Sequence, residues 1–248
     1  SDRKRIVVKV GTSTLTHRTG MLNIRRVEQL VKTLADIQNS GHEVILVSSG
    51  AIGLGMGKLG LRERPKDTPG KQACAAVGQC ELMYLYDNLF AEYSITVAQM
   101  LLTKYILLED RRKNVENAME RLIAHGVIPI INENDTVAID ELELEVGEND
   151  SLAATVAAIA KADLLIIMSD IDGLYDKDPH TYDDARLIPV VHEITDDIRA
   201  LAGGAGTKLG TGGMITKLNA VEIAYDSDID VVLMNGQHPK TLYDLFDG

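Results

Sequence analysis

The chain has 248 residues, of which 45% are hydrophobic and 25% charged, and its formal net charge is −12. This length suits one globular domain with a single substantial core, and the negative charge argues against nucleic acid as a partner, because a duplex-binding protein needs a basic face. A membrane span is excluded as well, since no run approaches the roughly 18 to 20 uninterrupted apolar residues that it requires.

The start of the chain and its cysteines carry no sign of export. Four of the first five residues are charged, and they pass directly into an apolar, strand-like run without a signal core. Cys74 and Cys80 fit neither a disulfide framework nor a CxxC metal site, so we expect two reduced thiols that serve packing. We therefore expect a cytoplasmic protein whose single domain spans residues 1–248.

Apolar runs alternate with amphipathic stretches along the chain. In chain order we expect a strand at 5–10, a helix at 23–40, a strand at 43–47, a helix at 71–91, a strand at 95–99, a helix at 111–125, a strand at 127–132, a surface hairpin at 136–146, a helix at 151–160, a strand at 163–168, an irregular acidic segment at 170–184, a strand at 187–192, a helix at 214–225 and a strand at 229–234. Such βαβ units predict an α/β fold with an open, mostly parallel sheet sandwiched between helix layers.

Two lysines near opposite ends of the chain each lie beside glycine and hydroxyl residues. Lys9 stands in the apolar run of residues 5–10, which then breaks into a Gly-Thr-Ser turn, and Lys217 follows a glycine-rich segment at the start of a helix. A solvated head is the ordinary alternative for a lysine, but the adjacent glycine turn favours an anion site at Lys9. Backbone N–H groups at the helix start would add positive potential beside Lys217. Together the two sites predict phosphoryl transfer.

Short polar segments follow four of the predicted strands, at residues 11–13, 48–51, 132–135 and 169–170. The carboxyl ends of parallel strands share one edge of a sheet, which is where ligands bind in open α/β folds. Turn formation and loop capping are the structural alternatives for these polar residues. Asp150 precedes an alanine-rich helix, where it can serve as N-cap and as charge partner at once. The clustering predicts a ligand site at this edge of the sheet.

Two familiar nucleotide motifs do not account for the glycines. Gly55, Gly57 and Gly60 satisfy GxGxxG, but the match begins well after the predicted strand and does not join it to a helix, as a dinucleotide site requires. The Walker pattern Gly-x4-Gly-Lys-Ser/Thr does not occur in the sequence. Residues 203–213 contain six glycines between structured segments, so we expect a ligand loop there.

Six short segments occur in a fixed order between residues 5 and 236. They are Val8-Lys9-Val10-Gly11-Thr12-Ser13, Val47-Ser48-Ser49-Gly50-Ala51-Ile52-Gly53, Gln72-Ala73-Cys74-Ala75-Ala76-Val77-Gly78-Gln79, Asn132-Glu133-Asn134-Asp135, Gly147-Glu148-Asn149-Asp150 and Gly210-Thr211-Gly212-Gly213-Met214-Ile215-Thr216-Lys217. Any one of them is weak, but together they resemble the amino acid kinase family, and within it the enzymes that act on free glutamate. The resemblance implies an open, largely parallel eight-stranded sheet. It also implies transfer of the γ-phosphoryl group of ATP to the γ-carboxylate of L-glutamate, the first step of proline synthesis.

The resemblance further implies roles for individual residues. Lys9 and Lys217 would neutralise the phosphoryl oxygens, and Asp150 would hold their two ammonium groups in place. The residues implied to bind glutamate are Ser49, Gly50, Ala51, Asp135 and Asn149. The residues implied to bind ATP are Lys9, Ser169, Asp170, Thr211, Gly212, Gly213, Met214, Ile215, Thr216 and Lys217. Mg²⁺ would accompany ATP without a dedicated metal ligand from the protein, proline would act as a feedback inhibitor, and the protein would be a homo-oligomer.

Two other functions stay open at this point. Another kinase of the same fold, acting on acetylglutamate, aspartate, UMP or a phosphonate antibiotic, would keep both lysines and change the acceptor loops. A non-catalytic sensor of an amino acid and a nucleotide would have no need of the charges on Lys9, Asp150 and Lys217. Many members of the family also carry a C-terminal RNA-modification-type (PUA) domain, and we expect none in this chain.

Overall fold

The computed structural model of the chain describes residues 2–103, 109–137, 149–203 and 213–247. Its centre is a sheet of six strands, namely β1 (Arg5–Val10), β2 (Glu43–Ser48), β3 (Val97–Leu102), β4 (Ile128–Glu133), β5 (Leu164–Ser169) and β6 (Asp230–Asn235). They lie in the order β3-β4-β2-β1-β5-β6, and every neighbouring pair is parallel. The predicted open parallel sheet is confirmed. The resemblance implies eight strands, and the described residues contain six.

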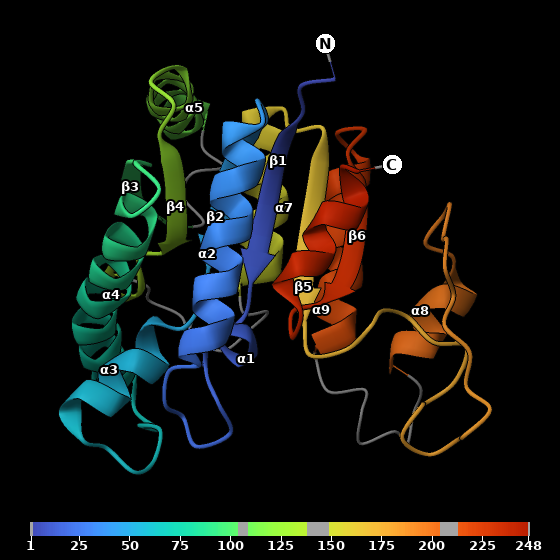
Figure 1. Cartoon of the computed structure of the whole chain (residues 1–248). Coiled ribbons are helices and arrows are strands. Elements are labelled where there is room, and N and C mark those ends of the chain that lie inside the picture. The colour runs from blue at the N-terminus through green and yellow to red at the C-terminus, as the bar shows by residue number, and fades with distance from the viewer. Residues whose placement is uncertain (1, 104–108, 138–148, 204–212, 248) are drawn as a thin grey trace.

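Helices cover both faces of this sheet (Figure 1). One face packs against α2 (Ile24–Asn39), α4 (Thr68–Ala91) and the 3₁₀ helix η4 (Pro239–Leu245). The opposite face packs against α5 (Glu109–Ala124), α7 (Asp150–Ala160) and α9 (Gly213–Tyr225). The predicted sandwich of helix layers is therefore confirmed. None of the helices that the structure describes combines the length and the apolar character needed to cross a lipid bilayer.

The described residues contain four further helices. Three of them follow strands closely, namely α1 (Thr12–Leu15) after β1, α3 (Ala51–Leu59) after β2 and η2 (Asp135–Val137) after β4. The fourth, α8 (Asp196–Gly203), belongs to the segment between β5 and α9 and stands away from the sheet in Figure 1. Because the strands are parallel, α1, α3 and η2 all begin at the same edge of the sheet.

Alternation along β1 decides which side chains meet which helix layer. Ile6, Val8 and Val10 belong to the core shared with α2 and α4, whereas Val7 belongs to the core shared with α7 and α9. Successive side chains of a strand point to opposite faces. Lys9 therefore lies on the face of Val7, toward the helices α7 and α9.

Most predicted elements are present with their ends shifted by a few residues, but the strand predicted at residues 187–192 is wrong. Leu187 makes only an isolated bridge with Tyr175. Pro189 cannot donate to a strand ladder, and Val190 is 63% exposed. This segment therefore lacks both the hydrogen bonding and the burial of an interior strand. The predicted hairpin at 136–146 and the glycine loop at 203–213 fall largely outside the described residues.

The helix α3 was not among the predicted elements, because three of its nine residues are glycine, a poor helix former. Its packing against α4 explains why it forms. A Cβ atom on Gly55 would lie 1.8 Å from the carbonyl oxygen of Cys74, and one on Gly78 would lie 1.5 Å from the carbonyl oxygen of Ala51. The two helix backbones are thus in direct contact, and only glycine permits that approach.

Candidate active site

Three buried charged groups meet at the carboxyl-terminal edge of the sheet. The ammonium nitrogen of Lys9 lies 2.8 Å from Oδ1 of Asp150, and that of Lys217 lies 3.2 Å from Oδ2. Lys9 and Asp150 are 1% and 0% exposed, and Lys217 is 7% exposed. The hydroxyl of Thr216 also donates to Oδ2, at 3.2 Å. Two ammonium groups and one carboxylate leave one net positive charge in a nearly dry site.

Each of these charged groups comes from a different element. Lys9 is on β1, Asp150 is the first residue of α7, and Lys217 lies in the second turn of α9. The N-terminus of a helix attracts negative charge, so the start of α7 is a favourable place for the carboxylate of Asp150. Oδ1 of Asp150 accepts no hydrogen bond of good angular geometry in the described structure, so its contact with Lys9 is ionic.

The alternative role of Asp150 as a helix N-cap is wrong. The N-cap position is held by Asn149, whose backbone is left-handed with φ 73° and whose side chain makes no capping bond. Asp150 lies inside the helix, so its carboxylate is directed at the two lysines instead of at backbone N–H groups. The shared contact with both lysines is observed; the part that it plays in phosphoryl transfer stays a prediction.

The predicted glutamate residues Ser49, Gly50 and Ala51 form the turn from β2 into α3. Gly50 has φ 108°, a left-handed conformation that favours glycine, and Ala51 opens the helix. The backbone N–H of Ser49 donates to the carbonyl oxygen of Val10 at 3.0 Å, which ties this turn to the end of β1. The first N–H groups of a helix have no partner within the helix, so the start of α3 is able to accept an anionic group.

The remaining predicted glutamate residues, Asp135 and Asn149, lie at the ends of η2 and α7 that face the same edge. Burial raises the pKa of Asp135 to about 6, and the positive charge of Arg64 opposes this shift. Asp135 lines a cavity of about 490 Å³ together with Gln79 and Gln99. The side-chain Nδ2 of Asn149 donates to Oδ1 of Asn132 at 2.5 Å. Asp135 and Asn149 therefore offer acceptor oxygens for a cationic group.

The predicted ATP residues fall into two groups. Ser169 ends β5, and its hydroxyl donates to the carboxylate of the exposed Asp170 at 3.2 Å and accepts from the N–H of Ile171 at 3.3 Å. Gly213, Met214, Ile215, Thr216 and Lys217 form the first residues of α9. Thr211 and Gly212 lie outside the described residues.

An apolar cavity of about 100 Å³ adjoins the start of α9. Met214 lines it together with Leu174 from the segment after β5 and with Leu201 and Ala202 of α8. Tyr175 and Lys177 supply aromatic and charged groups in the same lining. The cavity therefore lies beside the first turn of α9, in which Met214 precedes Lys217 by three residues.

Sequence reasoning missed the contribution of two glutamines. Nδ2 of Asn132 donates to Oε1 of Gln79 at 2.9 Å, and Nε2 of Gln79 donates to Oε1 of Gln99 at 3.0 Å. Gln79 stands in one of the six segments of the family resemblance, but no periodicity could show that it reaches Asn132, 53 positions away.

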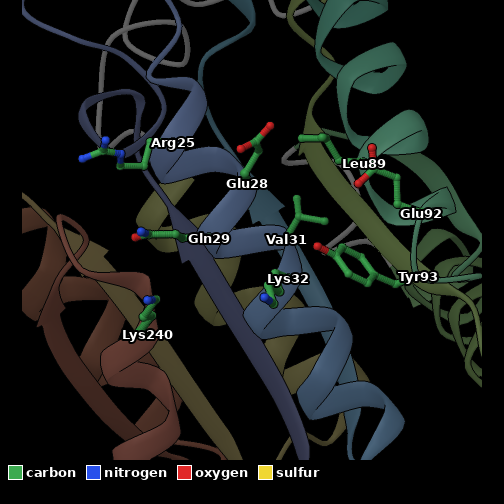
Figure 2. A pocket seen from close by; sticks show the side chains of 9 residues that line it. All are labelled: Arg25, Glu28, Gln29, Val31, Lys32, Leu89, Glu92, Tyr93 and Lys240. Carbon is green, nitrogen blue, oxygen red and sulfur yellow. The ribbon is translucent and has the colours of Figure 1, made fainter.

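A further cavity of about 390 Å³ lies over α2 and contains none of the predicted site residues (Figure 2). Its lining comes from α2, from η4, and from the end of α4 and the residues just after it. The charged residues of that lining are Arg25, Glu28, Lys32, Glu92 and Lys240. Because both signs of charge are mixed there on exposed helix surface, this cavity does not select a ligand class.

Comparisons with known proteins identify the family to which this chain is similar. The family model of the amino acid kinase family matches residues 4–235. A glutamate 5-kinase of Clostridium perfringens is 52% identical over 250 residues, which cover 100% of this chain and 93% of that protein. A glutamate 5-kinase of Caldanaerobacter subterraneus subsp. tengcongensis is 55% identical, and the match covers 96% of this chain and 64% of that protein.

Among solved structures, a carbamate kinase from Giardia lamblia bound to AMP-PNP has a TM-score of 0.66 at 18% sequence identity. The match covers 100% of this chain and 96% of that one. At this level of identity the likeness supports the fold alone.

Proposed function

The chain belongs to the amino acid kinase family, and on this premise we propose that it phosphorylates the γ-carboxylate of free L-glutamate, as the first step of proline biosynthesis. The observation that carries the proposal is the buried carboxylate of Asp150 shared between the ammonium groups of Lys9 and Lys217. The relatives named glutamate 5-kinase, at more than half identity, support glutamate as the acceptor.

The chemistry asks little covalent help from the protein. The acceptor carboxylate is already a nucleophile, so no general base is needed, and catalysis rests on alignment and on stabilisation of developing charge. Lys9 and Lys217 are held on separate oxygens of Asp150, which fixes the positions of two positive charges without neutralising both. We expect the transferred phosphoryl group to pass between these two ammonium groups.

ATP is the proposed phosphoryl donor. The N-terminus of the 13-residue helix α9 and the ammonium of Lys217 suit its phosphates, and the apolar cavity lined by Met214 and Leu174 suits a purine ring. In the described part of the chain, no three His, Cys, Asp or Glu side chains gather as a metal site. Mg²⁺ is ordinarily held largely by the phosphates of the nucleotide, and we propose that arrangement here.

The glutamate site is proposed between two sets of groups of opposite character. The N-terminus of α3, with Ser49, Gly50 and Ala51, offers donors for a carboxylate, whereas Asp135 and Asn149 offer acceptors for the α-ammonium. Such a site would hold one amino acid by both of its α-groups. This pairing distinguishes a free amino acid from N-acetylglutamate or UMP, and the relatives named glutamate 5-kinase support glutamate over aspartate.

Proline is the proposed feedback inhibitor, because it has the α-carboxylate and the protonated amine of glutamate but no γ-carboxylate to accept phosphate. It would compete with glutamate and leave kcat unchanged. Inhibition that excess glutamate does not overcome would contradict a shared site. The expected homo-oligomer and the cytoplasmic location stay predictions; light scattering of the purified protein would test the first.

The test of the proposed function is a coupled assay of ADP release with ATP, Mg²⁺ and a panel of acceptors. L-Glutamate should support turnover, and hydroxylamine should trap the acyl phosphate as a hydroxamate. A preference for aspartate, N-acetylglutamate or UMP would identify another kinase of the same fold. Binding of glutamate and ATP without ADP release would indicate the sensor alternative.

A further inference from the structure

Four side-chain amides form a continuous chain of hydrogen bonds, which we call the amide relay: Asn149, Asn132, Gln79 and Gln99. Asn149 donates to Asn132 at 2.5 Å, Asn132 donates to Gln79 at 2.9 Å, and Gln79 donates to Gln99 at 3.0 Å. The relay connects the start of α7 with β4, α4 and β3 in turn. The relay thus connects elements that are distant in sequence, and it ends at Asn149, a proposed substrate residue.

A backbone group fixes the direction of the relay. The N–H of Glu133 donates to Oδ1 of Asn132 at 2.8 Å. A backbone N–H can only donate, so this oxygen of Asn132 cannot exchange places with the NH₂ group without leaving two donors face to face. Asn132 is 4% exposed, so water does not relieve such a clash cheaply. Oδ1 of Asn132 therefore stays an acceptor, and its Nδ2 must donate to Gln79.

The consequence for Asn149 follows directly. One N–H of its NH₂ group donates to Oδ1 of Asn132, which fixes the orientation of the amide and leaves Oδ1 of Asn149 outside the relay as an acceptor. Glutamate carries one hydrogen-bond donor at neutral pH, its α-ammonium, while its carboxylates only accept. The Oδ1 atom of Asn149, held in this orientation, suits the ammonium and repels a carboxylate.

The position of Gln79 is itself fixed by packing. The preceding residue, Gly78, brings the backbone of α4 against the carbonyl of Ala51, where α3 begins. The same turn of α4 thus touches the proposed carboxylate site through Gly78 and the proposed ammonium site through Gln79. A shift of α4 would move both sites together.

We propose that Gln79 and Gln99 are positioning residues, which act through Asn132 to hold the amide of Asn149 with its oxygen toward the substrate ammonium. The inference rests on the proposed function, since it assumes that Asn149 contacts glutamate. Gln79 contributes more than Gln99, because Gln99 is exposed and water can replace it as the acceptor for Gln79.

The central variant is Gln79→Met, which keeps the length of the side chain and removes both of its hydrogen bonds. We expect it to raise KM for glutamate about 10-fold or more, with kcat and KM for ATP changed less than about 3-fold. Gln79→Glu keeps an acceptor for Asn132 and should remain within about 3-fold of the wild type. Gln99→Met should raise KM in the same direction by less. Gln29→Met, a glutamine on α2 outside the site, is the matched control and should leave every constant unchanged.

Two further measurements separate positioning from a general structural role. Glutarate lacks the α-ammonium, so its inhibition constant against glutamate should be the same in Gln79→Met as in the wild type. In a double-mutant cycle, Gln79→Met should add little to Asn149→Ala, because both changes remove the same contact. Additive effects, or an equal loss of glutarate binding, would show that Gln79 does not act through the orientation of Asn149.

The outcomes distinguish this inference from the proposed function. No turnover of glutamate by the wild type overturns both. Normal wild-type turnover with an unchanged KM in Gln79→Met, or with a loss confined to kcat or to KM for ATP, overturns the inference alone. If Gln79→Met fails to fold, the two other variants still test the inference. An unchanged KM for glutamate in Gln99→Met, together with a raised KM for glutamate in Gln79→Glu, would contradict the relay.

Discussion

The ammonium nitrogen of Lys9 lies 2.8 Å from Oδ1 of Asp150, and the two side chains are each 1% exposed. Removing two charges from water is costly, and the attraction between them offsets that cost only while both remain in place. Asp150 meets a second ammonium at its other oxygen, so these three side chains together carry one net positive charge. We infer that the cost in stability is retained for its use in binding an anionic group.

The first prediction concerns Asp150→Asn. The neutral amide removes the counter-charge that Asp150 gives to the buried ammonium groups of Lys9 and Lys217, so we expect the free energy of unfolding to fall by about 3 kcal/mol or more. We expect kcat to fall at least about 100-fold, because the two charges are no longer held in place. Urea denaturation and initial rates measure the two effects.

Asp196→Asn is the matched control, because Asp196 is also the first residue of a helix, α8, but is exposed. It should change neither stability nor rate appreciably. If the two variants behaved alike, the contribution of Asp150 would be limited to the helix terminus.

The second prediction concerns the lysines. Lys9→Met and Lys217→Met keep an unbranched side chain and remove the charge, so each should lower kcat by about 10² to 10³ while KM for glutamate changes much less. Lys113→Met serves as control, since Lys113 is 66% exposed on α5. Stopped-flow or coupled assays at saturating ATP give both constants. Wild-type turnover in either variant would reduce that lysine to a structural partner of Asp150.

The layout of the fold follows from patterns that are visible in the sequence. The apolar runs of β1 and β5 predict interior strands because such strands are buried on both faces, and the period of α2 places Val27, Leu30 and Leu34 in the core. Polar residues at the strand ends predict the edge where the site lies, since parallel strands end together. The helix α3 was not predictable in this way, because its glycines oppose a helix until α4 packs against them.

The site was predictable as a set of residues but not as a geometry. Motif resemblance nominates Lys9, Asp150 and Lys217, yet only the structure shows that Asp150 gives each lysine a separate oxygen. The hydrogen bond between Gln79 and Asn132 depends on how α4 is rotated about its own axis against β4. The hydrophobic periodicity of the sequence does not fix that rotation closely enough to predict the bond. Contacts between polar side chains of different elements are therefore the part that sequence alone leaves out.

The third prediction concerns pH. Burial raises the pKa of Asp135 from 3.8 to about 6, so the carboxyl group is largely neutral below pH 6 in the free protein. If ionised Asp135 binds the substrate ammonium, kcat/KM for glutamate should fall as the pH drops through about 6, because this ratio reports pKa values of the free enzyme. Asp135→Asn should lower kcat/KM and remove this dependence. A profile that keeps the same midpoint in Asp135→Asn would assign the titration to another group.

The positive charge of Arg64 provides a second test of the same titration. Arg64 lowers the pKa of Asp135 through its positive charge, so Arg64→Gln should move the midpoint of the profile to higher pH. This raised pKa makes stability depend on pH in the opposite direction to that of a salt-bridged carboxylate, whose pKa is lowered. A raised native pKa means that the contribution of Asp135 is fully present below pH 3.8 and is lost as the pH rises through about 6.

The last prediction compares two glycines in the α3 and α4 pair. Gly78→Ala would place a Cβ atom 1.5 Å from the carbonyl oxygen of Ala51, which only a separation of α3 from α4 relieves, so we expect a loss of about 3 kcal/mol or more in the free energy of unfolding. Gly57→Ala, on an open face of α3, has no atom within 4 Å and should stabilise the protein by about 0.5 to 1 kcal/mol.

The two substitutions should also differ in activity, and this separates site geometry from stability. Displacement of α3 moves Ser49 and Gly50 away from the end of β1, so the folded fraction of Gly78→Ala should show a raised KM for glutamate with KM for ATP little changed. Gly57→Ala should leave both constants unaltered. Urea denaturation with steady-state kinetics below the unfolding transition measures the pair. A Gly78→Ala protein that is destabilised but keeps its KM for glutamate would mean that the turn into α3 does not hold the substrate.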